Sequence, residues 1–204
     1  MLDIDHILTA APVIPVLVVE RVEDSLPMAR ALVAGGLKVL EVTLRTPAAL
    51  DAIRAMSEVE GAVVGAGTVL NPRQLEAAVR AGAQFVVSPG LSDGVAEAAA
   101  AAKVSLLPGV ANAGDIMRAL DHGLTRLKFF PAAASGGIPA LKAFSAVFGD
   151  VRFCPTGGIT LETAPEWLAL PAVACVGGSW LVPAGAIDEA AIEGRARQAA
   201  ALKR

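Results

Sequence analysis

The chain alternates eight times between a short apolar segment and a longer segment rich in alanine. The apolar segments carry many β-branched residues and have the length of strands, whereas the alanine-rich segments are good helix formers. The predicted strands are residues 13–19, 39–45, 62–69, 85–89, 105–110, 126–131, 152–156 and 174–178. The predicted helices are residues 25–34, 47–57, 72–81, 92–101, 113–122, 138–148, 161–168 and 188–202.

This repeat predicts an α/β fold in which helices connect parallel strands. Successive strands begin about 20 to 26 residues apart, a spacing that suits one strand–helix unit, and eight even units favour closure into a parallel (β/α)₈ TIM barrel. An open, doubly wound sheet is the alternative. Because hydrophobic residues make up 54% of the chain, the strands are expected to be covered on both faces. No linker divides the sequence, so we expect a single compact barrel domain over residues 1–204.

Local signals mark the ends of several predicted helices. Asn71-Pro72 and Thr46-Pro47 each offer a capping side chain followed by proline at the first helical position. Gly82 and Gly123 follow predicted helices, where glycine readily adopts the conformation that ends a helix. These signals support the helical assignment of the alanine-rich segments.

Composition and charge argue against several classes of function. The net charge is −3, there is no basic cluster, and aromatic residues make up only 4%, which argues against a nucleic-acid partner. No apolar run reaches the roughly 18 residues of a spanning helix, and the N-terminus is acidic, so we expect a cytoplasmic protein with no membrane partner. Two separate histidines and two cysteines without metal-ligand spacing argue against a metal cofactor.

Lys128 is the only lysine within a predicted strand. A lysine is almost never fully buried without a partner, because burial disfavours its charged form. Burial can leave a neutral, nucleophilic amine of the kind that forms a Schiff base. The structural alternative is a lysine whose stem packs while its head reaches water or a carboxylate.

Glu41 is the only carboxylate within a predicted strand. Since side chains alternate along a strand, Glu41, Thr43 and Arg45 are expected on one face, pointing into the barrel toward Lys128. Thr68 lies near the end of the third predicted strand and could add a hydroxyl. A purely structural polar network here would be costly and would add little net stability, so the cluster favours a functional site.

Two glycine pairs mark the ends of the last two predicted strands: Gly157-Gly158 follows the seventh, and Gly177-Gly178 ends the eighth, with Ser179 directly after it. In barrels, the loops after strands seven and eight often hold a phosphate, together with the N-terminus of a short extra helix. Glycines expose backbone N–H groups, and a helix start favours an anion. Arg45 remains free to bind a second anion, such as a carboxylate, in bidentate fashion.

These residues together predict a reaction. A neutral Lys128 would attack a ketone, and the resulting iminium ion would accept electrons as a neighbouring C–C bond breaks. Glu41 would move the protons. The substrate would be an anionic carbonyl compound with a phosphate at its far end, and no cofactor is needed.

The sequence resembles the 2-keto-3-deoxy-6-phosphogluconate (KDPG) aldolase family from about Pro12 to Pro183. The motifs that carry this resemblance are Glu41-Val-Thr-Leu-Arg-Thr46, Gly65-Ala-Gly-Thr-Val-Leu-Asn-Pro72, Ser88-Pro-Gly90, Arg126-Leu-Lys-Phe-Phe-Pro-Ala132, Cys154-Pro-Thr-Gly-Gly158 and Gly177-Gly-Ser-Trp180. The resemblance implies a class I aldolase that cleaves its substrate to pyruvate and glyceraldehyde 3-phosphate in the Entner–Doudoroff pathway. It also implies a homotrimer.

The resemblance also implies roles for individual residues. Lys128 matches the Schiff-base lysine and Glu41 the general acid/base, while Arg45 and Thr68 match binders of the pyruvyl carboxylate. The other matches are Pro89 and Phe130 as pocket walls, Thr156 as the residue that favours the gluconate over the galactonate epimer, and Gly157, Gly158 and Ser179 as the phosphate site. Ala133 departs from the pattern, because many family members carry a glutamate there.

Several alternatives remain open from the sequence. A galactonate-epimer aldolase would keep the same lysine chemistry, and 4-hydroxy-2-oxoglutarate, which lacks a phosphate, is a further possible substrate. A non-catalytic phosphosugar-binding barrel would use the glycine loops without needing both Lys128 and Glu41. An epimerase or isomerase would retain turnover without Lys128, and a metal-dependent aldolase would lose activity with a chelator.

Overall fold

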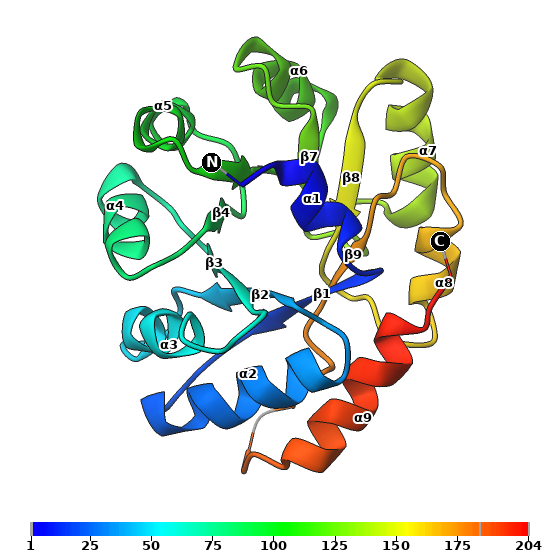
Figure 1. The fold of residues 1–204 in the computed structure, drawn as a ribbon. Coiled ribbons are helices and arrows are strands. Elements are labelled where there is room, and N and C mark those ends of the chain that lie inside the picture. The colour runs from blue at the N-terminus through cyan, green and yellow to red at the C-terminus, as the bar shows by residue number, and fades with distance from the viewer. Residues whose placement is uncertain (1, 184, 204) are drawn as a thin grey trace.

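The computed structural model describes residues 2–183 and 185–203 and has a ring of parallel strands with helices around it (Figure 1). One sheet has the order β5-β4-β3-β2-β1-β9, and a second has the order β6-β7-β8. The strands are β1 (Val13–Leu17), β2 (Val39–Thr43), β3 (Val63–Gly67), β4 (Phe85–Val87), β5 (Ser105–Leu107), β6 (Gly109–Val110), β7 (Arg126–Phe129), β8 (Arg152–Pro155) and β9 (Val176–Gly178). The predicted (β/α)₈ TIM barrel is confirmed, in preference to the open sheet.

Two junctions close the barrel between these sheets. β5 pairs with β4 and β6 pairs with β7, so β5 and β6 occupy one strand position that is interrupted at Pro108. Proline has no N–H to continue the ladder, but its carbonyl still accepts a hydrogen bond from the Lys128 N–H at 2.8 Å. On the other side, a bridge between Thr156 and Gly177 joins β8 to β9. The predicted strand 105–110 is therefore two short strands at one position.

The helices surround the ring of strands, except α1, which lies across one end of it (Figure 1). They are α1 (Ile4–Thr9), the 3₁₀ helix η1 (Val22–Asp24), α2 (Ser25–Ala34), α3 (Ala49–Met56), α4 (Pro72–Arg80), α5 (Asp93–Ala102), α6 (Ala113–Asp121), α7 (Gly137–Val147), α8 (Ala164–Leu168) and α9 (Glu189–Ala200). None of these described helices is long and apolar enough to cross a membrane.

One of the two predicted helix caps is confirmed and the other is wrong. The Asn71 side chain accepts a hydrogen bond from the Gln74 N–H at 3.0 Å, and Pro72 opens α4. Thr46 does not cap α3, which begins only at Ala49. Its hydroxyl instead donates to the Val19 carbonyl at 2.5 Å, so it ties the chain after β2 to the chain after β1.

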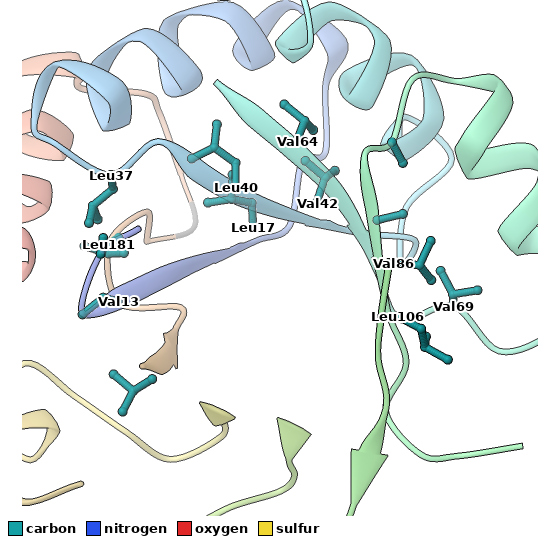
Figure 2. Close-up of a cluster of buried hydrophobic side chains, with 14 of the residues drawn as sticks. Val13, Leu17, Leu37, Leu40, Val42, Val64, Val69, Val86, Leu106 and Leu181 are labelled. Carbon is teal, nitrogen blue, oxygen red and sulfur yellow. The ribbon is translucent and has the colours of Figure 1, made fainter. Parts of the chain in front are cut away.

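Buried side chains form two layers, one on each side of the ring of strands. The outer layer packs between strands and helices, and Figure 2 shows Leu40, Val42 and Val64 pointing from β2 and β3 toward the helices. The inner layer fills one end of the barrel. Its members are Ile7, Leu8, Ile14, Val39, Phe85, Val87, Leu107, Cys154 and Cys175. Since the side chains of a strand alternate, β2 is left with Glu41 and Thr43 inside the barrel above this apolar layer.

The short helix α1 closes the N-terminal end of the barrel, and the sequence patterns did not predict it. Asp3 caps it by accepting from the Asp5 N–H at 3.1 Å. Ile7 and Leu8 are fully buried in the inner layer. Arg126, at the start of β7, donates from Nε and Nη2 to the Asp5 carboxylate, with Nη2 2.9 Å from Oδ2. The helix is thereby attached to the strand that carries Lys128.

Replacing Asp5 with asparagine is expected to lower the melting temperature at pH 7 by a few degrees. Arg126 lowers the pKa of the Asp5 carboxyl. The pair therefore stabilises the fold above the carboxyl pKa of the unfolded chain, about 3.9, and this contribution is lost as the pH falls through the lower folded pKa. Melting curves at pH 7, 4 and 3 should show the difference from wild type shrinking with acid. Asp51→Asn, which removes an exposed pair with Arg54, is the matched control and should have a smaller effect.

Candidate active site

The polar side chains predicted to point into the barrel meet at its C-terminal end, where barrel enzymes place their active sites. They line a cavity of about 150 Å³. Seven of the predicted site residues belong to it: Glu41, Arg45, Thr68, Pro89, Lys128, Phe130 and Thr156. Val16 and Thr43 line it as well. The cavity is smaller than a typical whole-ligand pocket.

Lys128 and Glu41 form an ion pair across the barrel. They come from β7 and β2, which lie on opposite sides of the ring. The Lys128 Nζ is 2.9 Å from Oε1 and 3.3 Å from Oε2 of Glu41. Both side chains are buried, at 6% and 4% exposure. Such a pair is costly to desolvate and adds little net stability, but it places a proton acceptor directly on the amine.

The surroundings of the pair keep it in a defined place. The ring of Phe130 lies 5.4 Å from the Lys128 Nζ, close enough for a cation–π contact. Below the pair, the Phe85 ring lies so close to Gly65 that a Cβ on this glycine would be 2.4 Å from the ring. The pair therefore sits above a close-packed apolar layer, where its electrostatic interactions are stronger than in water.

Gly67 of β3 leaves the space that the Glu41 carboxylate occupies. A Cβ on Gly67 would lie 2.2 Å from Oε1 and 2.7 Å from Cγ of Glu41, far closer than any side-chain contact. Which residue stands beside Glu41 depends on the register between β2 and β3, and the sequence patterns do not carry that information.

Arg45 reaches the mouth of the cavity and is held there by Thr43. The Arg45 Nε donates to the Thr43 Oγ1 at 3.1 Å, and the Thr43 hydroxyl donates to the Leu17 carbonyl at 2.7 Å. Among the described residues, Arg45 forms no ion pair with a carboxylate. Its remaining N–H groups can therefore bind an anionic ligand.

Thr68 has an unusual backbone conformation, with φ at 58°. A β-branched residue in the left-handed region is strained by roughly 1–3 kcal/mol, and such strain is concentrated at functional sites. The residue lines the cavity directly after β3. The strained turn thus places Thr68 in the same cavity as Lys128 and Glu41.

The four predicted phosphate residues lie at the rim and do not line the cavity. The bridge between Thr156 and Gly177 brings the two glycine pairs together, because Gly157 and Gly178 follow the bridged residues directly. Gly157 has φ at 101° and Gly158 at 76°. Within residues 2–183 and 185–203, the backbone N–H groups of Gly157, Gly158 and Ser179 have no acceptor. These N–H groups are available to an anion.

The sequence led us to expect a helix N-terminus at this rim, directly after Ser179. Within the residues that the structure describes, no helix begins there. A turn at residues 180–181 follows Ser179, and the next helix, α9, begins only at Glu189. Ser179 is exposed and lines a neighbouring cavity of about 270 Å³. Val16 lines this cavity and the Lys128 cavity alike, so the two are adjacent.

Ala133, the departure from the family pattern, packs against the glycine rim. Its N–H donates to the Gly157 carbonyl at 3.1 Å. A Cβ on Gly158 would lie 2.6 Å from the Ala133 Cβ. The small side chain at 133 therefore stands immediately beside one of the predicted phosphate glycines.

The part of the chain that the structure describes contains no group of three or more His, Cys, Asp or Glu side chains arranged to hold a metal ion. His122 lies at the end of α6, and its Nε2 is 3.0 Å from Oδ1 of Asp93. Arg118 and then His122 lower the pKa of the Asp93 carboxyl. This cluster lies outside the Lys128 cavity.

A family model described as KDPG and KHG aldolase matches residues 4–195. A relative from Zymomonas mobilis named 2-dehydro-3-deoxy-phosphogluconate aldolase is 60% identical over 204 residues, which cover all of this chain and 98% of that protein.

Solved structures agree with this match. A crystal structure of the 2-keto-3-deoxy-6-phosphogluconate aldolase of Zymomonas mobilis with 3-phosphoglycerate superposes with a TM-score of 0.98 at 60% identity, covering 99% of this chain and 97% of the other. A KDPG aldolase from Legionella pneumophila, with pyruvate captured as a covalent carbinolamine intermediate, has a TM-score of 0.94 at 47% identity, covering 97% and 98%.

Proposed function

The chain belongs to the KDPG and KHG aldolase family, and on this premise we propose that Lys128 and Glu41 carry out its class I aldolase reaction. The protein is a carbon–carbon lyase that cleaves 2-dehydro-3-deoxy-6-phosphogluconate to pyruvate and glyceraldehyde 3-phosphate in the Entner–Doudoroff pathway. The observation that supports the roles of the two residues is the buried pair with Nζ 2.9 Å from Oε1. The family match does not favour a non-catalytic phosphosugar-binding barrel.

In the proposed mechanism, Glu41 first takes a proton from the Lys128 ammonium. The neutral amine attacks the C2 ketone and forms a carbinolamine, and Glu41 returns the proton to the departing hydroxyl, which leaves as water. The Glu41 carboxylate then takes the proton of the C4 hydroxyl, and the C3–C4 bond breaks as the electrons of this bond move into the iminium ion. Aldehyde leaves, Glu41 protonates C3 of the enamine, and water releases pyruvate from Lys128.

The other cavity residues orient the substrate in this proposal. Arg45 offers its free N–H groups to the C1 carboxylate, and the Thr68 hydroxyl adds a second contact. Pro89 and Phe130 form the walls around the three pyruvyl carbons. Thr156 lies in the cavity beside Gly177, on the side toward the glycine rim, where it can contact the hydroxyl that distinguishes the gluconate from the galactonate epimer.

We propose that the rim of Gly157, Gly158, Gly178 and Ser179 binds the substrate phosphate. Free N–H groups on two adjacent loops suit an anion even without a helix start. Replacing Ser179 with alanine should raise the KM for the phosphorylated substrate about tenfold, since one hydrogen bond to a charged group is lost. The KM for 4-hydroxy-2-oxoglutarate, which has no phosphate, should stay unchanged. An equal rise for both substrates would contradict the phosphate role.

The test of the proposed function combines trapping with turnover. Incubation with pyruvate and borohydride should reduce the iminium ion and add a pyruvate-derived mass to the peptide that contains Lys128. A coupled assay for pyruvate release should be run with the gluconate compound, its galactonate epimer and 4-hydroxy-2-oxoglutarate. An adduct on any other peptide would overturn the role of Lys128, and turnover that is lost with a chelator would indicate a metal-dependent aldolase.

We also propose that the protein is a cytoplasmic homotrimer in which residues 1–204 form a single domain. The family resemblance supports the trimer. Exposed apolar side chains on neighbouring helices, Met117 at 60% and Val147 at 74% exposure, are consistent with a subunit contact. Light scattering would determine the mass in solution, and a monomer would contradict the proposal.

A further inference from the structure

We propose that Thr43 is a positioning residue that aims the Arg45 guanidinium at the substrate carboxylate. This inference rests on the proposed function, in which Arg45 binds that carboxylate. Thr43 is the last residue of β2 and is buried, with 1% exposure. Its side chain faces the same cavity as Glu41 and Lys128.

The hydrogen bonds of Thr43 have only one possible direction. The Leu17 carbonyl lies 2.7 Å from the Thr43 Oγ1 and can only accept, so the hydroxyl proton points toward it. The lone pairs of the hydroxyl are then left for the Arg45 Nε–H, at 3.1 Å. Thr43 is therefore an oriented acceptor that the end of β1 holds in place.

This bond selects which edge of the guanidinium faces the ligand. A guanidinium can grip a carboxylate through Nε and one Nη or through both Nη atoms. Because Nε is engaged by Thr43, the edge formed by Nη1 and Nη2 remains for the substrate. Arg45 is an exposed side chain with no carboxylate partner among the described residues. Without Thr43 it would sample many rotamers, and ordering them on binding would cost part of the binding free energy.

The experiment compares Thr43→Val, Thr43→Ser, Arg45→Ala and the double variant Thr43→Val/Arg45→Ala. Valine keeps the shape and β-branching of threonine but removes the hydroxyl. We expect Thr43→Val to raise the KM for the keto-acid substrate about tenfold while kcat changes by less than about threefold, the pattern of lost ground-state binding. Thr43→Ser keeps the hydroxyl and should bring the KM back to within about threefold of wild type.

The double variant separates positioning from a merely structural role. If Thr43 acts through Arg45, the valine substitution should add no further increase in KM once Arg45 is alanine. A tenfold increase in both backgrounds, or a lower melting temperature with an unchanged KM, would overturn the inference. If Thr43→Val does not fold, Thr43→Ala replaces it in both arms.

A failure of the proposed carboxylate-binding role of Arg45 would give a different pattern of KM values. If Arg45→Ala leaves the KM unchanged, the carboxylate role of Arg45 is wrong, and the inference about Thr43 fails with it. If Arg45→Ala raises the KM but Thr43→Val does not, only the positioning role is overturned.

Discussion

Replacing Lys128 with methionine is expected to reduce pyruvate release by about 10⁴-fold or more, because the proposed reaction loses its only covalent attachment point. Methionine has a similar length and is apolar, so the strand can keep its packing. The borohydride-trapped adduct should disappear from the Lys128 peptide. The measurement is the coupled pyruvate assay together with peptide mass spectrometry after trapping.

Loss of the ammonium also affects the fold, and this effect needs its own control. In Lys128→Met, Glu41 would remain buried without its partner. Removing one member of a buried ion pair lowers the free energy of unfolding by about 3–5 kcal/mol. Lys128→Arg keeps a positive charge opposite Glu41, but a guanidinium stays protonated and cannot form an imine. This variant should fold and still be inactive. Pyruvate release that survives in either variant would overturn the Schiff-base role of Lys128.

Which charged residues line the cavity could be predicted from the sequence because charged residues are rare in these strands. Glu41 and Lys128 each stand alone of their kind, and period-two alternation placed Glu41, Thr43 and Arg45 on one face. The structure confirms that these three residues line a cavity with Lys128, but β2 ends at Thr43, and Arg45 lies in the turn that follows the strand. What alternation could not supply is the distance across the ring, which depends on how many strands close the barrel and where each one starts.

The parts of the fold that the sequence did not reveal are those decided by tertiary contacts. α1 has six residues, too short for a periodic signal, and is stabilised by Arg126 and by burial of Ile7 and Leu8. Threonine is a common capping residue, yet the Thr46 hydroxyl donates a hydrogen bond to the carbonyl of Val19, far away in the sequence. In both cases a long-range partner outweighs the local preference.

Gly67 shows the same limit within the site itself. A glycine at the end of a strand has several ordinary explanations, such as a bend or a turn. Its role beside Glu41 follows from the register of β2 and β3, in which Thr43 pairs with Gly67 and Glu41 with Gly65. The space around the Glu41 carboxylate is therefore set by a neighbouring strand that is more than twenty residues away in the chain.

Replacing Gly67 with alanine is expected to lower kcat by about 10²-fold. The loss should not exceed about 10⁴-fold, the largest contribution typical of a general acid/base. The new Cβ would overlap Oε1, Cδ and Cγ of Glu41. These atoms belong to a flexible side chain rather than to backbone, so the carboxylate should move and the strand should remain. Overpacking should cost about 1–3 kcal/mol of unfolding free energy, while the contact between Oε1 and the Lys128 Nζ is lost.

Two comparisons show whether Gly67→Ala acts through Glu41. In a Glu41→Gln background, Gly67→Ala should lower kcat only slightly further, because the proton transfer that it disturbs is already lost. Gly90→Ala is the matched control, since a Cβ there meets nothing within 4 Å at the same end of the barrel, and its kcat should be that of wild type. The measurements are single-turnover rates of adduct formation and thermal melts. A full hundredfold loss on top of Glu41→Gln would mean that Gly67 supports the fold of β3 rather than the position of the carboxylate.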